Sequence, residues 1–286
     1  MRYAFIAENT SLYPVVRLCD VMQVSRRGYY SWLNRPPSAR SIANEDLLAH
    51  IKRLFYRYRR IYGAPRIHKA LGAEGVFCGL NRVARLMQEN RLLPRSVRKF
   101  RLTTDSRNSR NPAPNRLSRD FVATEPNQKW VADVTYIPTR QGWLYLATVL
   151  DLFSRKVVGW SMATRLDSRL AQRALLNAIQ ARKPRAGLMV HSDRGAEYYA
   201  ANYQSILKEH GFISSMSRKG DCYDNAVMES FFHSLKVEEL HHQQFDTRDE
   251  ARATVFEYIE MFYNRQRLHS SIGYVSPVEF EERSVA

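Results

Sequence analysis

Three acidic residues lie in segments whose other residues are typical of a buried strand or an apolar helix. Asp133 lies inside the strand-like segment 130–137, Asp193 ends a second such segment at 188–193, and Glu229 lies in a helical stretch. Burying a carboxylate costs free energy unless a partner offsets its desolvation. Mg²⁺ is such a partner, and it favours few carboxylates with water and phosphate oxygens in its remaining positions. The three residues therefore predict metal-assisted phosphoryl transfer on nucleic acid.

The reaction class follows from the inertness of phosphodiesters. Two metal ions about 4 Å apart can activate a water or 3′-hydroxyl nucleophile and stabilise the leaving oxygen. We expect Asp133, held rigidly in mid-strand, to bridge two Mg²⁺ or Mn²⁺ ions, with Asp193 and Glu229 as the flanking ligands. On its spacing alone, Glu229 is equally compatible with an ordinary solvent-facing helix acid.

The helix that contains Glu229 has further polar residues at helical spacing. Asn225, Glu229, His233 and Lys236 are separated by four, four and three residues, so they share one face of that helix. We expect Asn225, His233 and Lys236 to contact a DNA strand beside the metal ligand, and Asp224 to cap the helix.

Other acids and a basic residue in this region are assigned by position. Glu238 and Glu239 follow Lys236 and are expected on an exposed face. Arg194, in the turn after Asp193, is predicted to contact DNA. Asp151, at the end of a strand, is a candidate turn residue.

The net excess of positive charge is confined to the first part of the chain. The 286-residue protein has a net charge of +16. Residues 1–120 contain 24 Lys and Arg against 8 Asp and Glu, and residues 121–286 contain 20 of each. A basic part joined to a neutral part is typical of a nucleic-acid-binding module attached to another domain.

Two helical modules are predicted in the basic part. Residues 1–37 contain two short helices around a turn, with Ser25 as the cap of the second. This pattern predicts a helix-turn-helix whose Arg26, Arg27 and Tyr29 contact DNA, although a small helical hairpin with core aromatics fits it too.

Residues 44–93 form the second helical module, also of helix-turn-helix type. Arg82 and Arg85 are expected to face DNA, because a helix with charges of one sign repels itself without a polyanion. Residues 94–120, rich in Arg, Asn, Ser and Pro, are predicted to be a basic, flexible linker.

Residues 121–286 are predicted to form an α/β (α+β) catalytic domain. Strands are expected at 130–137, 143–152 and 156–163 as an antiparallel meander, followed by helices alternating with strands at 188–192 and 212–216. The helices are expected at 168–182, 200–210, 224–240 and 247–264. This order predicts a mixed sheet with flanking helices, in which the three carboxylates meet at one edge.

Neither a disulfide framework nor a membrane anchor is indicated. The three cysteines, Cys19, Cys78 and Cys222, are far apart in the sequence and lack metal-ligand spacing. No apolar run approaches the length of a membrane span, and a signal-peptide pattern is absent. We expect a cytoplasmic protein that associates with the nucleoid when bound to DNA.

The chain resembles the catalytic (OrfB) product of bacterial transposases of the insertion sequence three family, which share a retroviral-integrase-like core. The segments that carry the resemblance are Trp130–Ile137, Asp151–Trp160, His191–Gly195, Gly220–Phe232, Tyr62–Ile67, Tyr263–Ser270 and Ser276–Pro277. The resemblance implies an RNase H-like fold and a DDE triad at Asp133, Asp193 and Glu229, with Lys236 as the basic residue that follows. One departure is Glu197, where Gln is common.

The resemblance also implies an activity and partners. The activity is metal-dependent DNA strand cleavage and strand transfer, often through a circular DNA intermediate. The implied partners are the terminal inverted repeats, target DNA, an upstream-frame OrfA product and further copies of the chain on DNA. Two alternatives remain open: a non-enzymatic DNA-binding regulator, and a simple metal-dependent nuclease.

Overall fold

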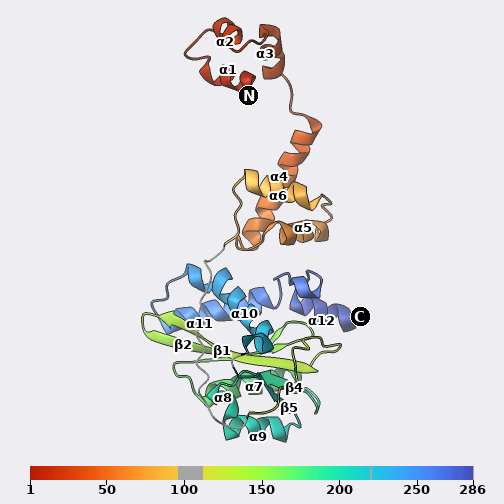
Figure 1. Cartoon of the computed structure of the whole chain (residues 1–286), viewed down its shortest axis with the longest axis vertical. Helices are drawn as coiled ribbons and strands as arrows, with labels where there is room; N and C mark the ends of the chain where they lie inside the picture. Colours follow the sequence, from red (N-terminus) through yellow and green to blue (C-terminus); the bar gives the residue numbers. More distant parts are fainter. Residues whose placement is uncertain (96–111, 220, 286) are drawn as a thin grey trace.

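Three parts follow one another along the long axis of the molecule (Figure 1). The computed structural model describes residues 1–95, 112–219 and 221–285. A small helical unit at the N-terminus is followed by a second helical unit, and the second unit packs on a sheet domain that contains the rest of the chain. No helix in these described ranges is long and apolar enough to cross a membrane.

The N-terminal unit is formed by α1 (Arg2–Asn9), α2 (Val15–Val21) and α3 (Arg26–Leu33). The two predicted helices are present, and Ser25 caps α3 by accepting a hydrogen bond from Gly28 N at 3.0 Å. The sequence interpretation did not include α1. These helices bury a core of their own, made of Ile6, Leu18, Cys19 and Tyr29.

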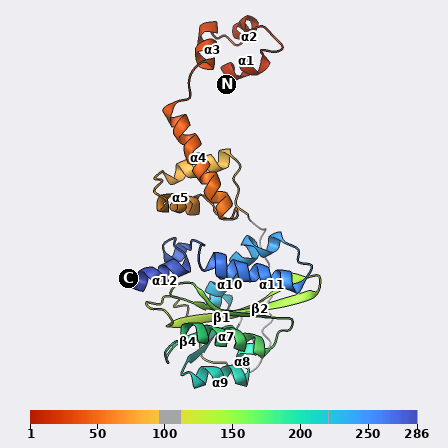
Figure 2. The ribbon, with the colours of Figure 1, turned by 180° about the vertical axis from the view of Figure 1, so that it is seen from behind.

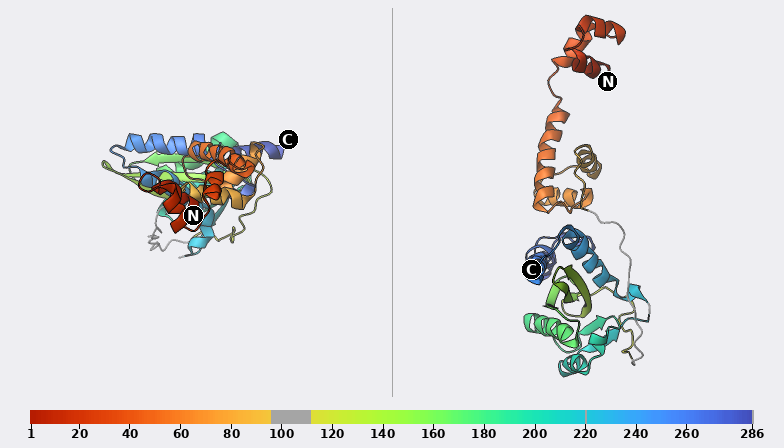
Figure 3. Two further views of the ribbon diagram at one scale, coloured as in Figure 1. Left: turned by 90° about the horizontal axis from the view of Figure 1, so that it is seen from above. Right: turned by 90° about the vertical axis from the view of Figure 1, so that its left-hand side faces the viewer.

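The second unit consists of α4 (Ala39–Arg57), α5 (Ala64–Ala73) and α6 (Leu80–Glu89). The first half of α4 extends away from the other two helices (Figure 3). After α4 the chain turns sharply, because Arg59 and Arg60 adopt left-handed conformations with φ of 56° and 61°. This turn delivers Ile61 and Tyr62 to the sheet domain.

The sheet has five strands: β1 (Lys129–Thr139), β2 (Gly142–Asp151), β3 (Val157–Ala163), β4 (Met189–Ser192) and β5 (Ile213–Met216). Their order is β3-β2-β1-β4-β5. The first three are antiparallel, and β4 and β5 run parallel to β1. The predicted meander, the mixed sheet and its fold class are confirmed.

Helices cover both faces of the sheet (Figure 2). One face carries α7 (Ser168–Arg182), α8 (Ala196–Tyr199) and α9 (Ala201–Glu209). The other carries α10 (Ala226–Glu238), α11 (Arg248–Phe256) and α12 (Pro277–Val285), of which α12 was not predicted. At Gly159 of β3 a Cβ atom would collide with the backbone of α7, so this close packing requires glycine.

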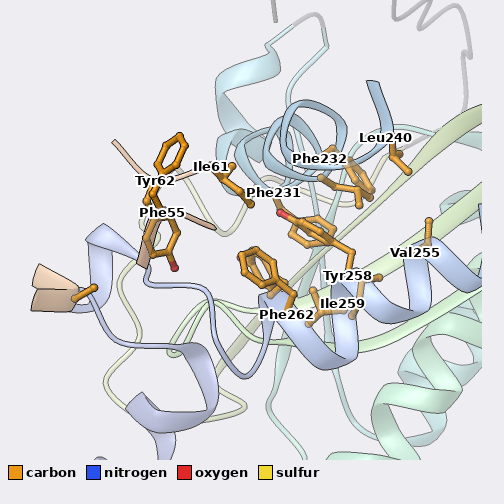
Figure 4. Close-up of a cluster of buried hydrophobic side chains, with 14 of the residues drawn as sticks. Phe55, Ile61, Tyr62, Phe231, Phe232, Leu240, Val255, Tyr258, Ile259 and Phe262 are labelled. Atoms are coloured by element: carbon orange, nitrogen blue, oxygen red, sulfur yellow. The ribbon is translucent and has the colours of Figure 1, made fainter. Parts of the chain in front are cut away.

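One hydrophobic core joins the second helical unit to the sheet domain. Phe55, Ile61 and Tyr62 lie beside side chains of α10 and of the helix after α11, including Phe231 and Phe262 (Figure 4). The Tyr62 hydroxyl accepts a hydrogen bond from Leu268 N at 2.7 Å. The α4–α6 unit is therefore packed onto the sheet domain as part of its core.

The predicted linker at 94–120 needs correction at its C-terminal end. Residues 96–111 lie outside the described residues. From residue 112 the chain packs on the sheet domain: Leu117 is buried, and the amides of Arg116 and Leu117 donate to Ser215 Oγ at 2.9 and 3.2 Å. Residues 112–120 therefore pack on the sheet domain, with Leu117 in its hydrophobic core, and do not form a flexible linker.

Candidate active site

The two aspartates are brought together by strand register. β1 and β4 are parallel neighbours, and Ala132 pairs with Ser192 at the end of β4. Asp133 and Asp193 each follow by one residue, so they lie side by side where the two strands separate. Asp133 Oδ1 accepts from Val134 N at 2.7 Å, and Asp193 Oδ1 accepts from Gly195 N at 2.8 Å.

Helix α10 brings Glu229 to the same place. Asn225 precedes this helix and donates from its amide nitrogen to the carbonyl of Ala132 at 3.3 Å, directly before Asp133 on β1. Glu229 follows one turn later, in the first turn of α10. This hydrogen bond holds the start of α10 against β1 and places Glu229 near enough to Asp133 to raise the pKa of Asp133.

Burial and neighbouring carboxylates raise pKa values at this site. Burial, then the neighbouring Asp193 carboxylate, raises the pKa of Asp133 well above its usual value, with smaller contributions from Glu197 and Glu229. Burial also raises the pKa of Asp193 and that of Glu229. A site that holds several carboxylates at elevated pKa favours a positively charged ligand.

Hard oxygen donors of this kind suit Mg²⁺ or Mn²⁺. Among the described residues, no three His, Cys, Asp or Glu side chains converge tightly enough to enclose one ion. The oxygen ligands therefore suit a divalent ion. In this structure, however, the described side chains do not surround a single position for that ion.

A fourth carboxylate, Glu197, folds back toward the site. A Cβ atom added at Gly195 would overlap the Glu197 carboxyl group, so this side chain lies directly over the turn after Asp193. Burial raises the pKa of Glu197, and Asp193 adds to the effect. The departure from Gln noted in the sequence thus adds negative charge to the site.

Lys236 is a half-buried cation on α10 that the Asp133 carboxylate affects. Burial lowers the pKa of Lys236, and the Asp133 carboxylate opposes that shift. The Lys236 ammonium lies 5.1 Å from the centre of the Tyr136 ring. Lys236 therefore lies near the part of β1 that contains Asp133 and Tyr136.

His191 supports the site without entering it. This side chain is buried two residues before Asp193 on β4, with Nδ1 2.9 Å from Ser215 Oγ and Nε2 3.1 Å from Ser217 Oγ. Burial lowers the pKa of His191 to about 4, so the imidazole is neutral at physiological pH. The hydroxyl groups of Ser215 and Ser217 thus connect His191 on β4 to β5 and the residue that follows it. These contacts fix the position of β4, which ends directly before Asp193.

Asp224 does not cap α10, so that prediction is wrong. Its carboxylate is buried and is bound by Arg218 at 2.8 and 3.0 Å, by Arg119 at 3.1 Å and by Asn115 at 2.8 Å. The hydrogen bond from Arg218 is the main cause of the lowered pKa of Asp224. The residue joins the segment before β1 to the loop before α10.

The predicted DNA-contact residues differ in their exposure to solvent. Arg26 and Arg27 are exposed on α3, and Arg85 is exposed on α6. His233 is exposed on α10, whereas Arg194 is half-buried and donates to the Ser217 carbonyl at 2.7 Å.

Three of these residues have other roles in the structure. Tyr29 is 2% exposed and belongs to the N-terminal core, so the geometry does not support a DNA contact there. Asn225 is 4% exposed and acts as the α10 anchor. Arg82 donates to Asn44 Oδ1 at 2.8 Å and ties α6 to α4.

The expectation that Glu238 and Glu239 are exposed is wrong. Glu238 is 5% exposed and accepts hydrogen bonds from Arg267 at 2.6 and 2.8 Å and from the Tyr258 hydroxyl at 2.8 Å. Glu239 accepts from Arg59 at 2.8 Å, and Arg59 also pairs with Glu257. The α4–α6 unit covers this end of α10, which helical periodicity alone does not reveal.

Comparison with known families agrees with this architecture. The description "Integrase core domain" matches residues 123–222 and, in a second form, residues 229–285. The description "HTH-like domain" matches residues 42–100. The three matches together cover the second helical unit and the sheet domain.

Individual relatives are similar over nearly the whole chain. The "Transposase InsF for insertion sequence IS3A" of Escherichia coli (strain K12) is 43% identical over 100% of both chains. The "Insertion element IS600 uncharacterized 31 kDa protein" of Shigella sonnei is 47% identical over 93% of this chain and 98% of its own.

Solved structures are more distant. The HTLV-2 integrase catalytic core domain in complex with magnesium (trimeric form) aligns with 18% identity and a TM-score of 0.44, over 56% of this chain and 99% of that one. The simian T-cell lymphotropic virus intasome in complex with PP2A regulatory subunit B56 gamma aligns with 14% identity and a TM-score of 0.46, over 75% and 70%.

Proposed function

The chain belongs to the IS3-family transposases, which have an integrase core, and from this premise we propose that Asp133, Asp193 and Glu229 are its catalytic carboxylates. The enzyme is a DDE transposase that acts on DNA. The observation that supports the assignment is the placement of Asp133 and Asp193 at adjacent positions after the paired ends of β1 and β4, with Glu229 on α10 near enough to raise the pKa of Asp133.

These residues would hold Mg²⁺ or Mn²⁺, in our proposal as two ions. When bound, the ions supply charge neutralisation and a nucleophile at neutral pH. The protein itself holds the carboxylates in place for the reacting DNA strand. Asp133 and Asp193 accept hydrogen bonds from backbone amides, and the hydrogen bond of Asn225 to β1 holds the start of α10, which contains Glu229. Lys236 then offers an ammonium to a phosphate of the same strand.

DNA is bound by the helical units in this proposal. Arg26 and Arg27 are exposed at the start of α3, where a helix-turn-helix presents side chains to DNA. Arg85 is exposed on α6 within the HTH-like match. The terminal repeats would be recognised by these units, while target DNA would approach the carboxylates.

Further copies of the chain and an upstream-frame product are proposed as protein partners. The first half of α4 supports this idea, because it lies clear of α5 and α6 on the way to the N-terminal unit and exposes Ile42 to solvent. A helix with an exposed apolar residue can pack against a second helix.

Glu229→Gln tests the catalytic assignment. This substitution removes a ligand charge and nearly preserves shape, so we expect Mg²⁺-dependent strand cleavage and strand transfer to fall by about 10²-fold or more. Glu209→Gln, on the exposed end of α9, is the matched control and should retain wild-type rates. Near wild-type cleavage by Glu229→Gln would remove Glu229 from the site.

The same assay separates transposase from nuclease. With a donor end that carries a 3′-hydroxyl, a transposase joins that end to a target molecule, and a nuclease gives hydrolysis products alone. We expect joined product with the wild-type protein. Binding of DNA without either product would favour a regulator.

A further inference from the structure

An exposed aromatic pair lies on the β1–β2 hairpin, beyond Asp133 along β1. Tyr136 and Trp143 are 41% and 48% exposed, and their ring centres lie 4.9 Å apart in an edge-to-face arrangement. Single exposed aromatics need no explanation, but two in contact leave a large apolar surface in water. We refer to Tyr136 and Trp143 as the aromatic shelf.

The shelf begins where the sheet opens. Among the described residues, β4 pairs with β1 only as far as Ala132, so from Asp133 onward the edge of β1 that faces β4 has no strand beside it. Tyr136 lies three residues beyond Asp133, and Trp143 is opposite Pro138 on β2. A strand of DNA held at Asp133 would therefore meet this edge.

A cation connects the shelf to the carboxylates. The Lys236 ammonium lies 5.1 Å from the Tyr136 ring centre and is close enough to Asp133 for that carboxylate to affect its pKa. Positive charge beside an exposed π surface is the combination with which proteins hold single-stranded nucleic acid: the charge takes a phosphate, and the ring stacks a base.

The shelf is held rigidly. Arg140, in the hairpin turn, donates its amide to the Phe245 carbonyl at 3.0 Å. Arg248 at the start of α11 donates to Gln141 Oε1 at 3.1 Å and to the Trp143 carbonyl at 3.3 Å. The hairpin is therefore fastened to α11, and its rings are positioned before any ligand arrives.

From this arrangement we propose that the aromatic shelf stacks an unpaired base of the DNA strand whose phosphate lies at the carboxylates. The proposal rests on the proposed function, because it takes the strand at Asp133 as given. An intact duplex buries its base faces in its own stack, so the shelf selects a strand with at least one unpaired nucleotide.

The test compares two DNA probes with the full-length protein in Mg²⁺, before measurable cleavage. One probe is a short blunt duplex, and the other is the same duplex with a single-stranded thymidine tail, made with either strand polarity. Because stacking one base on an aromatic ring is worth about 1–3 kcal/mol, the wild-type protein should bind one tailed probe about 5- to 150-fold more tightly than the blunt probe.

The variants decide which residues carry that preference. Tyr136→Ala and Trp143→Ala should each lose most of it while binding the blunt probe as the wild type does, which shows that the fold is intact. Trp143→Phe should keep most of it. Phe77→Ala removes an exposed aromatic from the loop between α5 and α6 and should keep all of it.

Equal binding of both probes by the wild type, or a tail preference that survives in Tyr136→Ala and Trp143→Ala, would overturn the proposal. Failure of the proposed function would look different. Cleavage that is unaffected by Asp133→Asn would count against the carboxylate assignment, whereas a missing tail preference with Asp133-dependent cleavage counts against the shelf alone.

Discussion

At the scale of single residues, the buried carboxylates of the candidate site lower the free energy of unfolding at neutral pH. Asp133 and Asp193 lie side by side in a partly desolvated place, where the pKa of each is raised. A carboxyl group with a raised folded-state pKa contributes most to stability below its unfolded pKa, where it is protonated in both states. That contribution is lost as the pH rises through the folded-state pKa.

Asp133→Asn should therefore stabilise the metal-free protein at neutral pH. The amide removes the buried negative charge, and a gain of about 1 kcal/mol would raise Tm by about 2–4 °C in a chain of this size class. Thermal unfolding in chelator, followed from pH 7 down to about pH 4, should show the difference from wild type shrinking as Asp133 becomes protonated.

The comparison needs a variant that changes charge without changing the site. Asp20→Asn, on the exposed side of α2, should leave Tm nearly unchanged at both pH values. A lower Tm for Asp133→Asn at neutral pH would show that the Asp133 carboxylate stabilises the metal-free fold. That result would contradict the claim that its buried charge is destabilising without a bound cation.

At the scale of elements, the strands and the positions of Asp133 and Asp193 on them were predictable from the sequence, whereas the docking of the α4–α6 unit was not. The Val-, Tyr- and Trp-rich segments around Asp133 predict β1 to β3 because alternation and turns are local properties. Helix α7 was predicted with its observed limits, since Asp167 caps it. Burial of Glu238 was missed because it depends on Arg267 and Tyr258, which are distant in sequence.

Glu238→Ala should strongly destabilise the protein. Arg267 is buried, and removing Glu238 leaves its guanidinium without its main partner, which costs about 3–5 kcal/mol for a buried pair. The free energy of unfolding from denaturant titration should fall by that amount. Glu282→Ala, on the exposed side of α12, is the control and should change it little. A loss within about 1 kcal/mol for Glu238→Ala would contradict the importance of this buried pair.

At the scale of the whole molecule, the boundary between hydrophobic cores lies at a different place in the chain from the boundary between its basic and neutral parts. The excess of Lys and Arg ends near residue 120, but the α4–α6 unit shares one hydrophobic core with the sheet domain. The N-terminal unit has a separate small core. The natural division for dissecting the protein is therefore at about residue 37, between α3 and α4.

Two deletions test this division. Removing residues 1–37 should leave the Tm of the remainder nearly unchanged and weaken DNA binding, with a shallower dependence on salt because fewer phosphate contacts remain. Removing residues 1–93 should lower Tm markedly, since it uncovers Phe231 and Phe262. Equal Tm values for both deletions would contradict a shared core.

The most direct test of the account is to locate Mn²⁺ in crystals of the protein by anomalous diffraction. The account predicts a peak at about 2.0–2.2 Å from carboxylate oxygens of Asp133 and Asp193, as expected for a hard octahedral ion, with Glu229 turned toward it. In Asp133→Asn crystals the peak should weaken or vanish. A Mn²⁺ peak elsewhere, with none at these carboxylates under conditions that support strand transfer, would contradict it.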